Sequence, residues 1–195
     1  MVERGVLMEC KNTAYLTFAK ARKIPYEIVE KLVNDCPELW KLMKYENPVG
    51  KPDLTKEEIS SMICPDSMNI DKYNVIFQKM SQQAVADETG KIFAQMRLQV
   101  LNSQSLNAST SRLFIVVEFV VNEKKMVCST DYTIYDNRAF AMLQSFLSAI
   151  NGQKLSEDNT VFLNGTQTAS ANFQLVNYNN EFSGYQVVMA SNITG

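Results

Sequence analysis

The sequence predicts an α+β fold: a mainly antiparallel, twisted sheet with a long helix packed on one face, preceded by short N-terminal helices. Three observations support this. Apolar residues recur at helical spacing in the first third of the chain, they alternate at strand spacing from residue 73 onward, and one isolated amphipathic helix lies among the strand segments. A helix set among strands buries its apolar stripe against one face of the sheet.

The long helix is predicted over residues 137–150. Asp136 is the expected N-cap, because its carboxylate can accept hydrogen bonds from the first-turn amides. Asn151-Gly152 is expected to end the helix, because glycine adopts the left-handed C-cap conformation without steric cost. The apolar side chains that define its buried face are Ala139, Leu143, Phe146, Leu147 and Ile150.

Short helices are predicted before the sheet, over residues 13–23, 26–34 and 37–45. A further short helix begins at Thr55 with the capping box Thr55-Lys-Glu-Glu58 and extends to about residue 63. The prolines and the glycine of residues 46–53 indicate a loop or hinge. These features divide the chain into an N-terminal helical segment (1–48), a linker with a short helix (49–72) and an α+β domain (73–195).

Strands are predicted over residues 73–79, 91–101 and 112–122, and after the long helix over residues 160–164, 172–178 and 184–191. Residues 112–122 are apolar on both faces, so this strand is expected to be central and covered on both sides. Glu118 interrupts its second face. A carboxylate there needs a partner, which we expect on the covering elements or in a neighbouring subunit.

A long polar loop without charge is predicted between the strands at 91–101 and 112–122. A connection of this length is unusual for a hairpin and is either functional or simply a surface loop. Its residues are Asn102, Ser103, Gln104, Ser105, Leu106, Asn107, Ala108, Ser109, Thr110 and Ser111.

The composition argues against an enzyme. The chain of 195 residues has no histidine, and its four cysteines show no metal-ligand spacing, so we expect no catalytic residue, cofactor or metal. A net charge of −2 lacks the basic footprint of a nucleic-acid-binding protein. No apolar run is long enough for a membrane span, and a reducing cytoplasm fits the scattered cysteines.

Several segments in order resemble the neck proteins of tailed bacteriophages, the head–tail connector, tail-completion and tail-terminator subunits. Specific points are the Tyr135-Asp-Asn-Arg-Ala139 helix start, the Asn151-Gly152 end and Phe182-Ser-Gly-Tyr-Gln-Val-Val-Met-Ala190. The similarity also includes the stretch from Pro37 to Glu58, and it covers roughly residues 37–190.

The resemblance implies a virion protein, made in the bacterial host cytoplasm, that forms a six- or twelve-fold ring between the portal side of the capsid and the tail tube. Double-stranded DNA would pass through the ring without specific binding. Loop 102–111 would face the lumen or a ring interface. The N-terminal helices would dock on an adjacent ring through Leu39, Trp40 and Met43. The alternative is a monomeric domain that binds a small ligand or peptide between helix 137–150 and the sheet.

Overall fold

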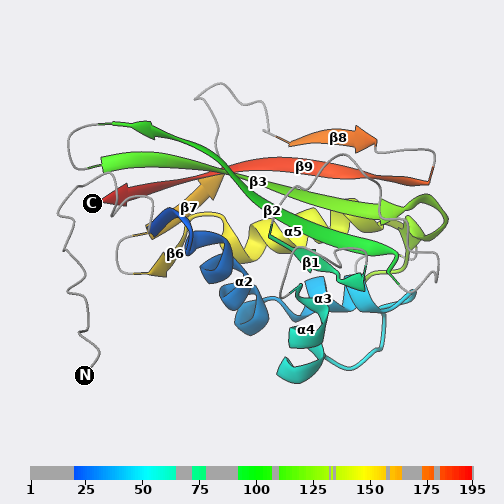
Figure 1. Ribbon diagram of the computed structural model, residues 1–195. Coiled ribbons are helices and arrows are strands. Elements are labelled where there is room, and N and C mark those ends of the chain that lie inside the picture. The colour runs from blue at the N-terminus through cyan, green and yellow to red at the C-terminus, as the bar shows by residue number, and fades with distance from the viewer. Residues whose placement is uncertain are drawn as a thin grey trace, which may run out of the picture.

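A computed structural model shows a long, twisted sheet with the helices gathered on one of its faces (Figure 1). The structure describes residues 20–64, 72–77, 92–106, 110–131, 133, 135–156, 159–163, 173–177 and 181–194. The predicted α+β class, with a long helix packed on one face of a mainly antiparallel sheet, is confirmed.

The described helices follow the predicted ones closely. Prolines at the first turns of α2 and α3 suit positions whose amides have no helical partner. The capping box of α4 is present: Thr55 Oγ1 accepts from Glu58 N at 3.2 Å, and Thr55 N donates to Glu58 at 2.8 Å. The helix predicted at 13–23 lies largely outside the described residues. The bounds are α2 Ile24–Asp35, α3 Pro37–Lys44, α4 Lys56–Met62, α5 Arg138–Ile150 and the short 3₁₀ turn η2 Glu123–Lys125.

The expected N-cap of α5 is wrong by one residue. Asn137 caps the helix, with its side-chain oxygen accepting from Phe140 N at 3.0 Å. Asp136 instead pairs with Cys128 in a two-stranded ribbon and accepts a hydrogen bond from Thr130 Oγ1 at 3.0 Å. The predicted end of the helix is correct, since Gly152 has a φ of 73°.

The sheet order is β1-β2-β3-β9-β7-β6, and β8 also pairs with β9. Among the strand pairs that the structure describes, β1–β2 is the parallel one, and the single bridge between Ile63 and Val75 is parallel as well. β8 lies beside the first half of β9, and β7 lies beside its second half. The bounds are β1 Val75–Ile76, β2 Ala94–Ser105, β3 Thr110–Asn122, β6 Gln153–Ser156, β7 Asn159–Leu163, β8 Phe173–Asn177 and β9 Phe182–Thr194, with the separate ribbon β4 Val127–Cys128 and β5 Asp136–Asn137.

The predicted loop 102–111 is mostly strand. Asn102, Ser103, Gln104 and Ser105 belong to β2, and Thr110 and Ser111 belong to β3. Ser103 pairs with Leu113, and Ser105 pairs with Ser111, so the backbone ladder continues through a sequence of low strand propensity. Only residues 106–109 connect the strands, and Asn107, Ala108 and Ser109 lie outside the described residues.

β3 is central, as predicted, and both of its faces are buried. The face toward the helices belongs to the main core, where the rings of Phe119 and Phe146 on α5 meet edge-to-face with centroids 5.4 Å apart. On the other face Val116 and Val120 are also buried. Residues of α2 and α3 belong to the same core cluster as the sheet, so the core is continuous across the predicted boundaries at 48 and 72.

β3 and β9 approach each other closely at Gly184. A Cβ atom at this position would overlap the carbonyl oxygen of Phe119 on the neighbouring strand. Gly184 pairs with Val120 on one side and with Val176 of β8 on the other. Only glycine therefore allows this spacing of the strands.

Candidate functional surfaces

The predicted docking surface of Leu39, Trp40 and Met43 is wrong. All three side chains are buried, with exposed fractions of 0%, 0% and 1%. Trp40 Nε1 donates to the carbonyl of Leu32 at 3.0 Å, which satisfies the only polar atom of its side chain. The apolar stripe of α3 faces α5 and the sheet, where the same side chains hold the fold together and are not available to another ring.

Arg138, in the first turn of α5, is the centre of a fully buried polar junction. Its guanidinium donates to the carbonyls of Leu42 at 2.6 Å, Tyr45 at 3.0 Å and Lys125 at 2.8 Å, and to that of Glu46. The first two carbonyls belong to the last turns of α3, which have no helical donors of their own. One side chain therefore satisfies the end of α3 and the turn after β3 together.

The charge of Arg138 is stabilised mainly by the dipoles of backbone carbonyls, and less by ion pairs. Burial lowers the pKa of Arg138, while the Cys128 thiol and the Glu46 carboxylate oppose that shift. The guanidinium carbon lies 4.9 Å from the centroid of the Phe93 ring, a cation–π distance. Lys125 pairs with Glu46 at 2.7 Å just outside. We define the buried junction as Trp40 and Arg138 with the carbonyls that they bind.

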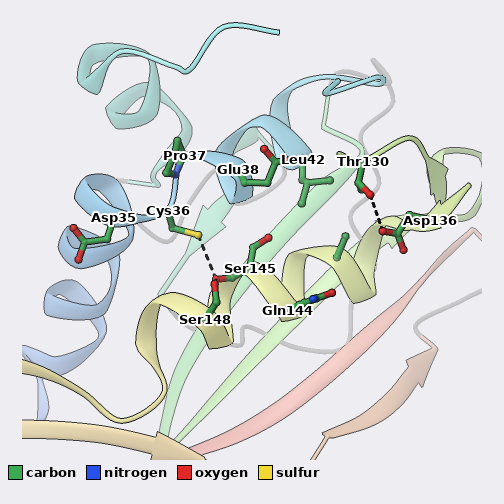
Figure 2. A pocket seen from close by; sticks show the side chains of 11 residues that line it. Asp35, Cys36, Pro37, Glu38, Leu42, Thr130, Asp136, Gln144, Ser145 and Ser148 are labelled. Carbon is green, nitrogen blue, oxygen red and sulfur yellow. Dashed lines mark hydrogen bonds between the residues drawn. The ribbon is translucent and has the colours of Figure 1, made fainter. Parts of the chain in front are cut away.

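A groove of about 200 Å³ lies between α5 and the α2–α3 corner (Figure 2). The alternative function predicted a pocket between helix 137–150 and the sheet, but this groove lies between helices. Its volume is below the range typical of drug-sized ligands. The lining residues are Asp35, Cys36, Pro37, Glu38, Leu42, Thr130, Asp136, Ala141, Gln144, Ser145 and Ser148.

The carboxylates at this groove already have partners. Asp35 pairs with Lys31 at 2.7 Å, and Glu38 pairs with Lys41 at 3.2 Å. Asp136 accepts the hydrogen bond from Thr130 described above. Within the described ranges, no three cysteine or carboxylate side chains gather closely enough to hold a metal ion.

The Cys36 thiol faces the groove but is poorly suited to nucleophilic chemistry. Burial raises its pKa to about 11, partly opposed by a hydrogen bond from the Leu39 backbone, so the thiolate is scarce near neutral pH. Its Sγ lies 3.4 Å from the carbonyl oxygen of Ser145 on α5, within hydrogen-bond distance for a thiol (Figure 2). This cysteine therefore links α2 and α5 structurally.

Glu118 has a partner on the adjacent strand, a position that the sequence pattern does not predict. Glu118 on β3 is directly opposite Arg97 on β2, and their charged atoms are 4.0 Å apart. Arg97 Nε also donates to Gln95 at 3.3 Å, and Gln95 donates to the carbonyl of Tyr73 at 2.8 Å. Both members of the ion pair are buried, and each charge has the other as a partner away from water.

Exposed apolar side chains meet where β8, β9 and the start of α5 come together. Leu175 on β8 is 63% exposed and pairs in register with Tyr185 on β9. The Tyr185 ring meets the ring of Phe140 on α5 at 5.7 Å between centroids, and Phe140 is 41% exposed. We call Leu175, Tyr185 and Phe140 the apolar corner. Val127 and Tyr135, on the adjoining β4–β5 ribbon and its approach, are also exposed.

No family model matches this chain, and a search of curated proteins finds no match. None of the described helices has the length and apolar content needed to cross a membrane. The sequence did not indicate the apolar corner, because its three residues come from separate elements. A weak signal existed in β8, whose segment carries no charge although it is exposed.

Proposed function

We propose that the chain is a structural, non-enzymatic subunit that assembles with copies of itself into a ring at the neck of a tailed bacteriophage. The observation that carries the proposal is the apolar corner. Exposed apolar side chains that lie close together on a folded domain are typical of a contact with another protein. The proposal places the ring between the portal side of the capsid and the tail tube, as a tail terminator or head–tail connector.

The residues on which the phage resemblance rests have defined structural roles. Asn137 caps α5, and Arg138 forms the buried junction. Gly152 ends the helix, and Gly184 allows the close approach of β3 and β9. These roles support a shared fold. With a net charge of −2, a lumen wall built from this chain would not grip passing DNA.

Static light scattering of the full chain across concentration tests the proposal. A six- or twelve-fold multiple of the 22.1 kDa subunit is expected, and negative-stain images should then show a ring with a central channel. A mass that stays at 22.1 kDa at every concentration contradicts a self-assembling ring. That outcome favours the alternative, a monomeric ligand- or peptide-binding domain, for which the groove at α5 is the site to examine.

A further inference from the structure

β8 lies at an edge of the sheet. It pairs with β9 along its whole length, Phe173–Asn177, without a shift of register. Among the described residues, those of β8 form no hydrogen bond beyond this ladder, and no described strand pairs with their outer side. Figure 1 shows β8 at the rim of the sheet, away from α2, α3 and α4. The backbone N–H and C=O groups on its outer side are therefore available to another strand.

The composition of β8 does not protect this edge against pairing. Its sequence, Phe-Gln-Leu-Val-Asn, has no charge and no proline, and Leu175 at its centre is 63% exposed. β6, the outer strand beside the other half of β9, carries the exposed Lys154 and has an irregular register with β7. Charges and irregularities of this kind discourage edge-to-edge pairing. β8 contains neither, so its edge suits an extended strand that is itself uncharged.

β8 of a second copy meets this requirement in one register. Two identical strands related by a two-fold axis perpendicular to the sheet pair in the antiparallel sense. Residues directly opposite each other lie on the same face of a sheet, so Leu175 must meet a residue of its own face. With Leu175 opposite Leu175 of the second copy, every residue of β8 has a partner. The next permitted registers are shifted by two residues and pair less of the strand.

We propose that two copies of this chain pair through their β8 strands, with Leu175 opposite Leu175, so that one sheet continues across a two-fold axis. Leu175 is in register with Tyr185 on β9, whose ring contacts Phe140 of α5. The two leucines therefore lie on the face of the sheet that α5 covers, and they join the apolar corners of both copies into one strip. Pairing removes these exposed side chains from water. Because β8 has no charge, pairing it with itself opposes no like charges.

The described helices and strands leave room for a second copy beside β8. α5 contacts β3 and β9, so the α5 helices of the pair lie about four strand spacings apart, roughly 19 Å, which exceeds the diameter of a helix. β6 lies one strand further out than β8, but through β7 its pairing is level with Ser191 of β9. β8 ends level with Val187. β6 therefore leaves the space directly beside β8 open.

This contact goes beyond the proposed ring. A two-fold contact closes after two copies, so it cannot by itself extend into a ring. In the proposed twelve-fold ring the pair would be the building unit, and a second, different contact would join one pair to the next. The pair itself requires no ring, and it stands if the chain assembles no further.

Opposite charges at position 175 test the pairing. As concentration rises, light scattering of the wild type should show growth from the 22.1 kDa subunit to pairs or to assemblies of pairs. Leu175→Lys and Leu175→Glu should each stay at the subunit mass, because like charges would lie opposite each other. An equimolar mixture should recover the pair, because the lysine of one variant then lies opposite the glutamate of the other.

The matched control is Val49→Lys, at an exposed residue (43%) of the loop between α3 and α4. This variant should assemble like the wild type. Circular dichroism checks that every variant is folded.

A cysteine at the same position tests the register. Opposite residues of an antiparallel pair have Cα atoms about 4.5–5.5 Å apart, within the range of a disulfide. Leu175→Cys should therefore form a disulfide-linked dimer when oxidised glutathione is added, as seen on a non-reducing gel. Cys36, Cys64 and Cys128 are buried and should not compete. Val49→Cys is the control and should give no more dimer than the wild type.

The outcomes separate the pair from the ring. Wild-type dimers that grow no larger support the β8 contact and contradict the ring. Rings that form equally well from the wild type and from both charged variants overturn the β8 contact while the ring function stands. A mixture of the charged variants that stays at the subunit mass, or Leu175→Cys that cross-links no more than Val49→Cys, also overturns the contact. A wild type that stays at the subunit mass at every concentration overturns both proposals.

Discussion

The buried junction and the apolar corner lie at the same end of α5 but differ in almost every physical respect. At the junction, Arg138 is completely buried, and the hydrogen bonds of its guanidinium are accepted by backbone carbonyls of the same chain. At the corner, Phe140, only two residues further along the helix, is 41% exposed and contacts a half-exposed tyrosine. One helical turn thus contributes to the interior and to the surface at once.

This difference separates stability from recognition. The junction joins α3, α5 and the turn after β3, so its loss should weaken the whole fold. At the corner, Leu175 and Phe140 contribute little to the folded monomer, because their side chains are 63% and 41% exposed. Substitutions at the junction should therefore change the unfolding free energy strongly. Substitutions at the corner should change assembly and leave the unfolding free energy nearly unchanged.

Trp40→Ala should give the largest effect. Removing a fully buried indole leaves a cavity and removes one of the two hydrogen bonds to the Leu32 carbonyl, so the unfolding free energy should fall by about 3–5 kcal/mol. Urea denaturation measures the change. Tyr135→Ala, at an aromatic residue 81% exposed, is the control and should change the free energy by less than about 0.5 kcal/mol. Equal effects at the two sites would contradict the burial of Trp40.

Arg138→Met should rank second, at about 3 kcal/mol, because the buried carbonyls of α3 and of Lys125 lose their donor. Arg138→Lys should recover little of that loss, since one ammonium cannot reproduce the planar set of donors. Arg112→Met is the control: Arg112 donates to Asn192 at 3.1 Å from a half-buried position, and its loss should cost about 1 kcal/mol. A stable Arg138→Met variant would show that the junction is dispensable.

The pH dependence of stability should reveal the burial of Cys36. Its pKa rises from 9.0 to about 11 on folding, so the unfolded chain releases this proton first as pH increases. The contribution is therefore complete below pH 9 and is lost between about pH 9 and 11, on the order of 2 kcal/mol. Cys36→Ser should remove the part of the fall in unfolding free energy that is due to the thiol. The part that is due to lysine and tyrosine side chains should remain. Parallel curves for the two proteins would argue against a buried thiol.

Leu175→Lys should have the smallest effect on folding. Its exposed position predicts a change in unfolding free energy within about 0.5 kcal/mol, although the same variant should lose assembly. Thermal melting at a concentration where the wild type is monomeric measures the stability of the folded monomer without a contribution from assembly. A loss above about 1 kcal/mol would place Leu175 in the core and remove the contrast between the two regions.

Periodicity and turn chemistry predicted most of the fold. The α5 stripe, the capping box at Thr55 and the apolar strand at 112–122 each combine several residues in one local pattern, and each is present. The prediction of a loop over residues 102–111 is wrong because the backbone of these residues pairs with neighbouring strands. This pairing, between β2 and β3 and between β3 and β9, overrides the weak strand propensity of Ser and Asn. The N-cap of α5 is one residue later than predicted, because Asp136 accepts a hydrogen bond from Thr130 and Asn137 caps the helix.

The surfaces were less predictable than the core. Trp40 was assigned to a docking surface because an apolar helix stripe looks the same in sequence whether it meets another subunit or its own sheet. The sequence shows Arg138 only as part of a helix start, because its role depends on the carbonyls of Leu42 and Tyr45, more than ninety residues earlier in the chain. The apolar corner arises only when β8 and α5 meet at β9, which no local pattern encodes.

The close approach at Gly184 has a consequence for evolution. Any side chain there would push β9 away from Phe119, so drift at this codon should be almost entirely silent. The neighbouring Tyr185 and Leu175 face no such restriction, and they can change whenever a partner surface changes with them. In distant relatives whose other residues have diverged, a glycine two places after the start of the last long strand would be among the final traces of common descent.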